Sequence, residues 1–305
     1  MSKAQLSRAQ QNGRLMRLAT YASVTTALVL IAAKVGAWWM TGSVALLSSL
    51  IDSLLDAAAS LVTLFAVSHA LAPADAEHRF GHGKAEPLAA LVQAGLITGS
   101  ALFLVFEALP RLLNPQPIES GGVGLAVMVF SILATFALTR FQYYVVRRTG
   151  STAISADALH YFADLLTNAG VIVALILATQ FNLLLADPII ALIIAGYIFW
   201  SALQIGRKAL DMLMDRELPD SQRKRILEVV RAHPDVLGVH DLKTRESGQV
   251  TFIQLHLELE GGMSLYRAHV IADTVEADLQ THFPGANVII HQDPHVLSED
   301  TPVYQ

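Results

Sequence analysis

The chain has 305 residues, of which 53% are hydrophobic and only 15% are charged, and its formal net charge at pH 7 is −5. Soluble domains carry about 25% charged residues, so a large part of this chain is too apolar to be an ordinary soluble domain. The mildly acidic balance, without a basic stripe, argues against nucleic acid as a partner. The lack of cysteine excludes disulfides and thiolate metal sites, so a bound metal would need His, Asp, Glu or carbonyl oxygen.

The long apolar runs are confined to residues 18–210, and the remaining C-terminal part has the composition of a soluble domain. A helix needs about 20 mostly apolar residues to cross a membrane. We therefore predict an N-terminal tail at 1–17, a membrane domain at 18–214, a soluble domain at 215–297 and a loose tail at 298–305. Six stretches are apolar enough to span: roughly 18–40, 43–71, 88–113, 121–146, 153–181 and 186–208.

Lys and Arg near the ends of the spans predict the orientation, because basic residues concentrate on the cytoplasmic side. The first 17 residues are polar and basic and lack a cleavage-site signature, so we interpret them as a cytoplasmic tail. The loop at 72–87 and the C-terminal domain fall on the same side, as an even number of spans requires. The basic residues on that side are Arg14, Arg17, Arg79, Lys84, Arg140, Arg147, Arg148, Arg207 and Lys208.

Two pairs of potential metal ligands lie inside predicted spans. Asp52 and Asp56 are four residues apart in the second span, and His160 and Asp164 are four residues apart in the fifth. This spacing places both members of a pair on one face of a helix. An intramembrane carboxylate is costly and normally faces a partner, a cavity or an ion. Two helices that each present two ligands can form a four-ligand site.

The residue types favour a divalent transition ion at this site. Carboxylate oxygen and imidazole nitrogen suit zinc in tetrahedral geometry, whereas calcium and magnesium prefer more oxygens and no imidazole. The alternative is a proton relay or a set of buried ion pairs. No Lys or Arg lies at matching depth in the second or fifth span, so neither span offers its carboxylates an ion-pair partner of its own. Lys34 in the first span could still pair with one of them.

The loop between the second and third spans is short and rich in glycine, and it contains Asp75, His78 and His82. A polar loop can hold two histidines without binding metal, so the pattern in isolation leaves both interpretations open. Near the end of the third span, Glu107 and Arg111 form an i,i+4 pair, which we interpret as local charge pairing close to an interface.

The C-terminal domain has the periodicities of an α+β fold. The order helix, strand, strand, helix, strand predicts a small sheet backed by two helices, an αββαβ domain of the metallochaperone or ferredoxin-like kind. In the second strand, Gln254, His256 and Glu258 share one face, and Ile253 breaks the alternation. The predicted elements are 220–233, 236–245, 249–259, 264–282 with Ser264 as the cap, and 287–291.

This domain holds seven of the eleven histidines. If the hairpin turns at residue 248, His240 and His256 face each other on one side of the sheet. His291 and Asp293 leave the last strand beside them, and His269 on the helix could reach the same edge. We assign no role to His233, His282 or His295.

Four segments of the sequence resemble the cation diffusion facilitators, most closely the bacterial YiiP-type exporters. The resemblance runs from about residue 18 to 294, and no predicted ligand position departs from the family pattern. The segments that carry it are residues 49–56, 73–86, 157–164 and 289–294.

The resemblance implies a homodimeric zinc/proton antiporter of the bacterial inner membrane, with three kinds of metal site. It implies a gate at Leu159 and a charge interlock between Lys84 and Asp215. It further implies that the soluble domain dimerises and binds metal. The implied ligands are Asp52, Asp56, His160 and Asp164 for transport; Asp75, His78 and His82 in the loop; and His240, His256, His269, His291, Gln292 and Asp293 in a cytoplasmic binuclear site.

The expected mechanism is alternating access, in which metal and protons compete for the same ligands and His160 exchanges the proton. Cadmium, iron, manganese and cobalt remain alternative substrates to zinc. Two other classes are a passive divalent channel and a metal-sensing scaffold. An intramembrane zinc protease is disfavoured, because the sequence lacks His-Glu-x-x-His and four protein ligands would close the coordination shell.

Overall fold

A computed structural model describes residues 3–42, 44–113, 122–181, 183 and 185–295. The chain divides into two compact units, residues 11–213 and residues 214–305 together with residues 1–10. The predicted tail at 298–305 lies outside the described residues. Each unit is considered by itself below.

The first unit contains six long helices, all apolar and long enough to cross a membrane, which confirms the predicted number of spans. The first helix starts at Lys3, so most of the predicted N-terminal tail continues the first span as helix. The helices are α1 (Lys3–Thr41), α2 (Val44–Ala70), α3 (Ala85–Leu113), α4 (Gly122–Thr149), α5 (Thr152–Phe181) and α6 (Ala186–Leu213).

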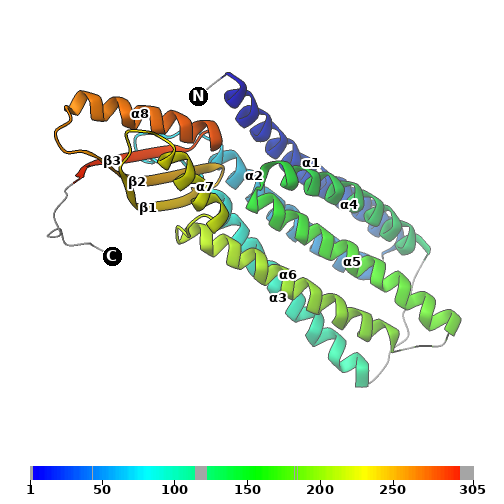
Figure 1. The fold of residues 1–305 in the computed structure, drawn as a ribbon. Helices are drawn as coiled ribbons and strands as arrows, with labels where there is room; N and C mark the ends of the chain where they lie inside the picture. The colour runs from blue at the N-terminus through cyan, green and yellow to red at the C-terminus, as the bar shows by residue number, and fades with distance from the viewer. Residues whose placement is uncertain (1–2, 43, 114–121, 182, 184, 296–305) are drawn as a thin grey trace. The chain divides into compact units, whose positions relative to one another are not determined.

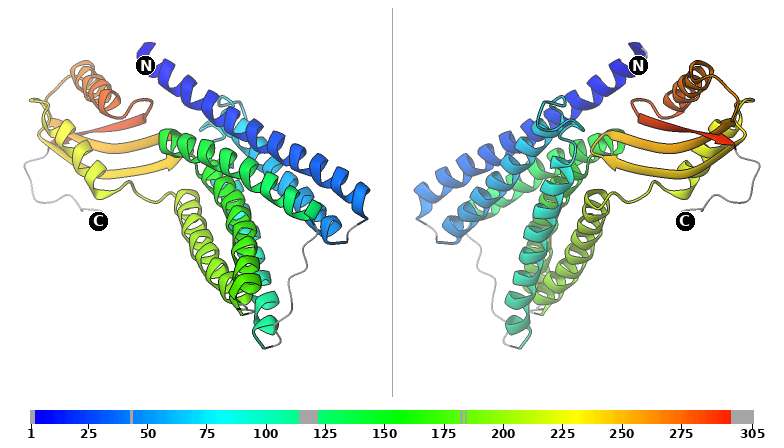
Figure 2. Two further views of the ribbon diagram at one scale, coloured as in Figure 1. Left: turned by 90° about the vertical axis from the view of Figure 1, so that its right-hand side faces the viewer. Right: turned by 90° about the vertical axis from the view of Figure 1, so that its left-hand side faces the viewer.

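Helix α5 is the central element of this unit, because it contacts α2, α3, α4 and α6. The closest helix pair is α3 with α6, which lie side by side over their length (Figure 1). Figure 2 shows α3, α5 and α6 running together at an angle to α1, α2 and α4. The side chains of α5 therefore reach both groups of helices.

A buried carboxylate joins these two groups. Asp157 on α5 is 1% exposed, and it accepts hydrogen bonds from three neutral donors on three other helices. The donors are Ser23 Oγ on α1 at 2.7 Å, Gln93 Nε2 on α3 at 3.3 Å and Gln142 Nε2 on α4 at 2.6 Å. A buried carboxylate needs such partners to be tolerated.

A chain of hydroxyl groups extends this network to α2. Ser60 Oγ lies 2.8 Å from Ser23 Oγ and 2.8 Å from the hydroxyl of Tyr161, one turn after Asp157 on α5. A hydroxyl has one proton to donate. Because Ser23 donates to Asp157, Ser60 donates to Ser23 and Tyr161 donates to Ser60. Five helices thus share one polar network.

The second unit confirms the predicted αββαβ order. The core forms between one face of the central strand and both helices, and includes Ile226, Ile253, Leu257 and Val275. Strand β2 pairs antiparallel with β1 and parallel with β3, giving the order β1-β2-β3. The elements are α7 (Asp220–Arg231), β1 (Gly238–Ser247), β2 (Val250–Glu260), α8 (Leu265–His282) and β3 (Asn287–His295), with Ser264 capping α8 as predicted.

The facing pair His240 and His256 is confirmed, but the register behind it differs from the prediction. The two-residue turn at 248–249 aligns Ser247 with Val250, which alone would set His240 one residue off. A β-bulge between His240 and Lys243 restores the pairing. Asp241 lies in this bulge with φ +48°, a conformation that Asp tolerates better than most residues.

Phe252, rather than Ile253, departs from the expected alternation in β2. Ile253 is fully buried in the helix-covered core with Leu255 and Leu257. Phe252 lies on the face of His256 and packs under the guanidinium of Arg245, whose carbon is 4.0 Å from the ring centre. The face that carries His256 is therefore the one opposite the helices.

Replacing Asp157 with Ala should destabilise the whole membrane unit. The change removes the acceptor of the buried donors Ser23 Oγ and Gln142 Nε2, at about 1–3 kcal/mol for each unsatisfied group, whereas Gln93 Nε2 keeps its bond to Thr63. We expect the unfolding temperature of the detergent-solubilised chain to fall by several degrees in a tryptophan-fluorescence melt. Thr179→Ala, which removes only an exposed hydroxyl bonded to its own helix, should leave the melt unchanged; equal melts for both variants would refute the role given to Asp157.

Candidate metal centres

Within the described residues, three groups of His and Asp side chains bring potential ligand atoms within 4.8 Å of one another. The groups lie inside the membrane unit, in the loop between α2 and α3, and on the sheet of the soluble unit. Each contains residues that the sequence predicts as ligands. The chemistry differs little between them, because all three combine carboxylate oxygen with imidazole nitrogen.

The intramembrane group joins α2 to α5. His160 Nε2 lies 3.0 Å from Asp56 Oδ1, and Asp164 completes the group one turn further along α5. The side chains of His160 and Asp56 are 14% and 18% exposed. A carboxylate on either side of an imidazole, partly shielded from solvent, suits a divalent transition ion.

Asp52, the fourth predicted ligand, is exposed and does not belong to this group. It lies one turn before Asp56 on α2. The same stretch of α2 is held by Lys34 on α1, whose Nζ donates to the Ser49 carbonyl at 3.0 Å and to Ser53 Oγ at 2.6 Å. Three of the four predicted ligands thus converge in this conformation.

Leu159, the residue before His160, is buried in an apolar cluster with Ile97 on α3 and Ile198 on α6. Its neighbours are the helices that run together with α5. The predicted gate residue therefore packs between α3, α5 and α6, and its role as a gate remains a prediction.

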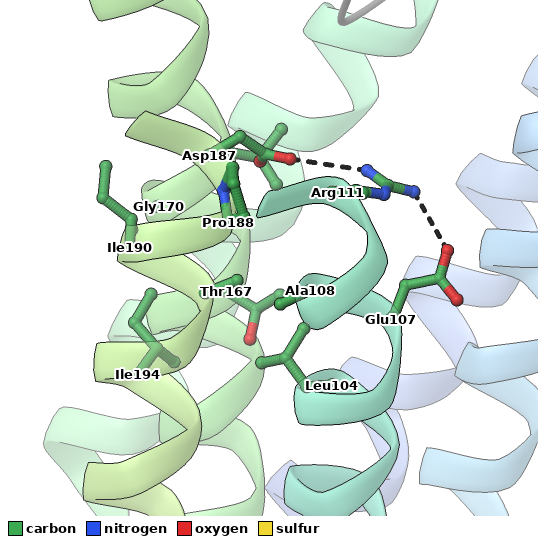
Figure 3. Close-up of a pocket in the computed structure, with 12 residues that line it drawn as sticks. Leu104, Glu107, Ala108, Arg111, Thr167, Gly170, Asp187, Pro188, Ile190 and Ile194 are labelled. Carbon is green, nitrogen blue, oxygen red and sulfur yellow. Dashed lines mark hydrogen bonds and ion pairs between the residues drawn. The ribbon is translucent and has the colours of Figure 1, made fainter. Parts of the chain in front are cut away.

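A cavity of about 190 Å³ lies between α3, α5 and α6 (Figure 3). Thr167, three residues after Asp164, lines it. At its mouth, Arg111 pairs with Glu107 at 3.1 Å, as predicted, and also with Asp187 of α6 at 3.4 Å. The cavity extends along α5 away from the ligand group toward this charged cluster.

The loop brings Asp75, His78 and His82 together as predicted. Asp75 Oδ2 lies 3.1 Å from His82 Nε2, and Asp75 Oδ1 lies 3.5 Å from His78 Nδ1. The backbone N–H of His78 donates to Asp75 Oδ1 at 2.6 Å and lowers the pKa of that carboxyl, with a further bond from Glu77 N–H. The carboxylate therefore stays ionised at neutral pH, as a metal ligand must.

On the sheet, His240, His256 and Asp293 form the third group. Asp293 Oδ2 lies 2.8 Å from His256 Nδ1 and 3.3 Å from His240 Nε2, while Oδ1 lies 3.1 Å from His291 Nε2. The rings of His240 and His291 have centres 5.0 Å and 4.6 Å from that of His256. One carboxylate thus contacts three imidazoles, one from each strand.

Two predicted members of this site lie apart from the group. His269 is exposed on α8 and pairs with Asp273 of its own helix at 3.5 Å. Gln292 is aligned with Leu257 in the β2–β3 register, so its side chain lies on the face opposite His291.

Asp241 is a candidate ligand that the sequence analysis missed. Its Oδ2 lies 3.6 Å from His256 Nε2, on the side away from Asp293. A hydrogen bond from Lys243 Nζ at 2.8 Å lowers the pKa of its carboxyl and keeps it ionised at neutral pH. Only the bulge brings Asp241 to His256, and the sequence pattern gave no sign of a bulge.

The two predicted interlock residues belong to different units. Lys84 Nζ donates to the Leu213 carbonyl at the end of α6, 3.3 Å away, which suits a cation at a helix C-terminus. Asp215, in the other unit, pairs with Arg245 at 3.4 Å. The charge interlock between Lys84 and Asp215 remains a prediction.

Comparison with known proteins covers nearly the whole chain. Residues 20–214 match the cation efflux transmembrane domain, and residues 218–295 match the cytoplasmic domain of cation efflux proteins. The cation-efflux pump FieF of Klebsiella pneumoniae is 49% identical over 285 residues, 93% of this chain and 95% of the pump. FieF of Yersinia enterocolitica is 48% identical over 284 residues, 93% of this chain and 94% of the pump.

The chain belongs to the cation diffusion facilitator family. Its YiiP-type character is confirmed, and the chain is a multi-pass membrane protein of a family of cation transporters. A solved structure described as the zinc form of a putative zinc transporter, CzrB, is 36% identical; the match covers 27% of this chain and 93% of the solved chain, with a TM-score of 0.24.

Among the residues of this facilitator's sheet site, Asp293 should matter most for metal affinity. Asp293 contacts three histidines, so Asp293→Ala removes one ligand and also the residue that orients the other ligands. Loss of an orienting residue alone lowers metal affinity about 10–100-fold. Zinc titration of the purified chain by calorimetry should show one class of sites weakened by at least that much. Asp220→Ala, which removes an exposed acidic residue that pairs with Arg223 on α7, should leave all classes unchanged. Equal effects of the two substitutions would contradict the assignment.

Proposed function

We propose that this facilitator exports Zn²⁺ from the cytoplasm in exchange for protons, as a homodimer in the bacterial cytoplasmic membrane with both termini inside. The observation that carries the proposal is the Asp56–His160–Asp164 group, shared by two spans of a cation-efflux protein. An intramembrane group of this composition is costly unless an ion or a proton occupies it.

The ligand set supports zinc as the substrate. Imidazole and carboxylate bind zinc tetrahedrally, and no thiolate is available to select softer ions. Cd²⁺, Fe²⁺, Mn²⁺ and Co²⁺ accept the same ligands and remain alternative substrates.

The contact between His160 and Asp56 supports proton exchange. A metal binds only deprotonated ligands, so arrival of an ion expels a proton from the imidazole or from a carboxylate beside it. Because imidazole titrates near neutral pH, the proton returns once the ion leaves on the opposite side. In the proton-loaded form, the proton shared by His160 and Asp56 takes the place of the ion.

The position of Asp52 supports alternating access. Three ligands converge without Asp52. A movement of α2 that brings Asp52 to the other three would add the fourth ligand and complete the coordination shell. Leu159 and its apolar neighbours would part for release into the cavity lined by Thr167. The Arg111–Asp187 pair at the cavity mouth then opens with α3 and α6.

The two further sites support regulation rather than translocation. We propose that the loop binds metal through Asp75, His78 and His82. On the sheet, we propose a binuclear site formed by His240, His256, His291 and Asp293, with His269 and Gln292 recruited in the metal-bound dimer. This site would link two soluble domains and sense cytoplasmic zinc.

His160→Ala should abolish proton-coupled transport. In reconstituted vesicles, an opposing pH gradient should drive zinc uptake by the unaltered chain, and uptake by the variant should fall to the level of empty vesicles. His282→Ala, at an exposed position on α8, provides the control. Zinc flux that ignores the pH gradient would favour a passive channel, and zinc binding without flux would favour a scaffold.

Asp52→Ala should weaken metal binding at the transport site, although Asp52 lies outside the converged group. We expect a rise in the zinc Km of about tenfold or more, because the variant cannot complete the four-ligand shell. Ser53→Ala, which removes the neighbouring hydroxyl bonded to Lys34, should change Km far less. An unchanged Km for Asp52→Ala would restrict the site to three protein ligands.

A further inference from the structure

We propose that His69, in the last turn of α2, is a fourth protein ligand of the loop metal site. A divalent transition ion there would be held by one carboxylate and three imidazoles: Asp75, His78, His82 and His69. The inference rests on the proposed metal-binding role of the loop. It adds a residue from a spanning helix to a site otherwise formed by the loop alone.

The three imidazole rings are close enough to share one ion. The centres of His69 and His82 are 4.2 Å apart, with the ring planes inclined by 58°, and those of His78 and His82 are 4.8 Å apart. Two imidazoles bound to one tetrahedral zinc ion, at Zn–N distances of about 2.0–2.1 Å, have ring centres about 5 Å apart. Both pairs therefore lie near the spacing of shared coordination.

His82 supplies a second, independent observation. Its side chain is 4% exposed, and its Nε2 lies 3.1 Å from Asp75. Its Nδ1 is buried and has no hydrogen-bond partner among the residues that the structure describes. An unpaired buried polar atom destabilises the fold and calls for an explanation, such as a metal ion bound to the His82 imidazole.

Packing of the rings alone does not explain why position 69 is a histidine. The residue is exposed at the end of its helix, where an apolar ring would satisfy packing as well as an imidazole. The carboxylate opposite is already fixed, since Asp75 Oδ1 accepts backbone hydrogen bonds from Glu77 and His78. His69 lies outside the group whose ligand atoms are within 4.8 Å of one another, so its coordination requires its exposed side chain to rotate toward the ion.

A fourth protein ligand changes what the loop site can do. Three protein ligands leave a coordination position open to water, whereas four close the shell, as in structural zinc sites. A closed site would retain its ion rather than pass it on. It would also fasten the end of α2 to the loop that leads into α3. His69 follows Asp56 by 13 residues on α2, about 20 Å along the axis, so the bound ion would restrain the helix that carries the transport carboxylates.

The test uses the full chain with the two other sites disabled by Asp56→Ala, His160→Ala, His256→Ala and Asp293→Ala. In this background we would measure Co²⁺ binding by visible absorption and Zn²⁺ affinity by competition. Tetrahedral Co²⁺ absorbs far more strongly than Co²⁺ with five or six ligands. His69→Phe keeps a flat ring against His82 but removes the nitrogens, and His282→Phe makes the same change in the last turn of α8.

We expect His69→Phe to lower the Zn²⁺ affinity about tenfold or more and to weaken the Co²⁺ absorption, with His282→Phe having no effect. Unchanged affinity and absorption in His69→Phe would overturn the role of His69 while leaving the loop site intact. Failure of the background protein to bind either ion, or binding that survives His82→Ala, would instead overturn the loop site itself. Thermal melts of each variant identify any that fail to fold, in which case His69→Gln replaces His69→Phe.

Discussion

The membrane unit depends on one buried carboxylate. Asp157 accepts hydrogen bonds from α1, α3 and α4, and its hydroxyl chain reaches α2, so five helices meet at a group that cannot be left unpaired in the bilayer. His160 follows it by one turn on the same helix. The network therefore fixes where α5 presents its transport ligands, and a rocking motion of the helices must preserve these bonds or exchange them together.

In the loop and on the sheet one carboxylate orients the imidazoles around it, whereas in the membrane two carboxylates flank one imidazole. Asp56 contacts His160, Asp75 contacts His78 and His82, and Asp293 contacts three histidines. In each group the ligands come from different elements or from both sides of a turn. Binding an ion consequently restrains one element against another: α2 against α5, the loop against itself, and three strands against one another.

Much of this arrangement could be predicted from the sequence, because it depends on periodicity. Apolar length gives the six spans, and i,i+4 spacing places Asp56, His160 and Asp164 on facing helix surfaces. The rest depends on tertiary detail. Asp52 is set apart by the rotation of α2, Asp241 reaches His256 only through a bulge, and His69 approaches His82 only through the path of the loop. None of these leaves a periodic signal.

The row of histidines across the sheet has a consequence for folding. His240, His256 and His291 lie at aligned positions on three strands, on the face that the helices leave open. A slip of one residue in either outer strand would turn its histidine to the opposite, apolar face. A metal ion bound by these three histidines would therefore stabilise the native strand register over a shifted one. The ion would help the sheet to fold correctly as well as report the cytoplasmic metal concentration.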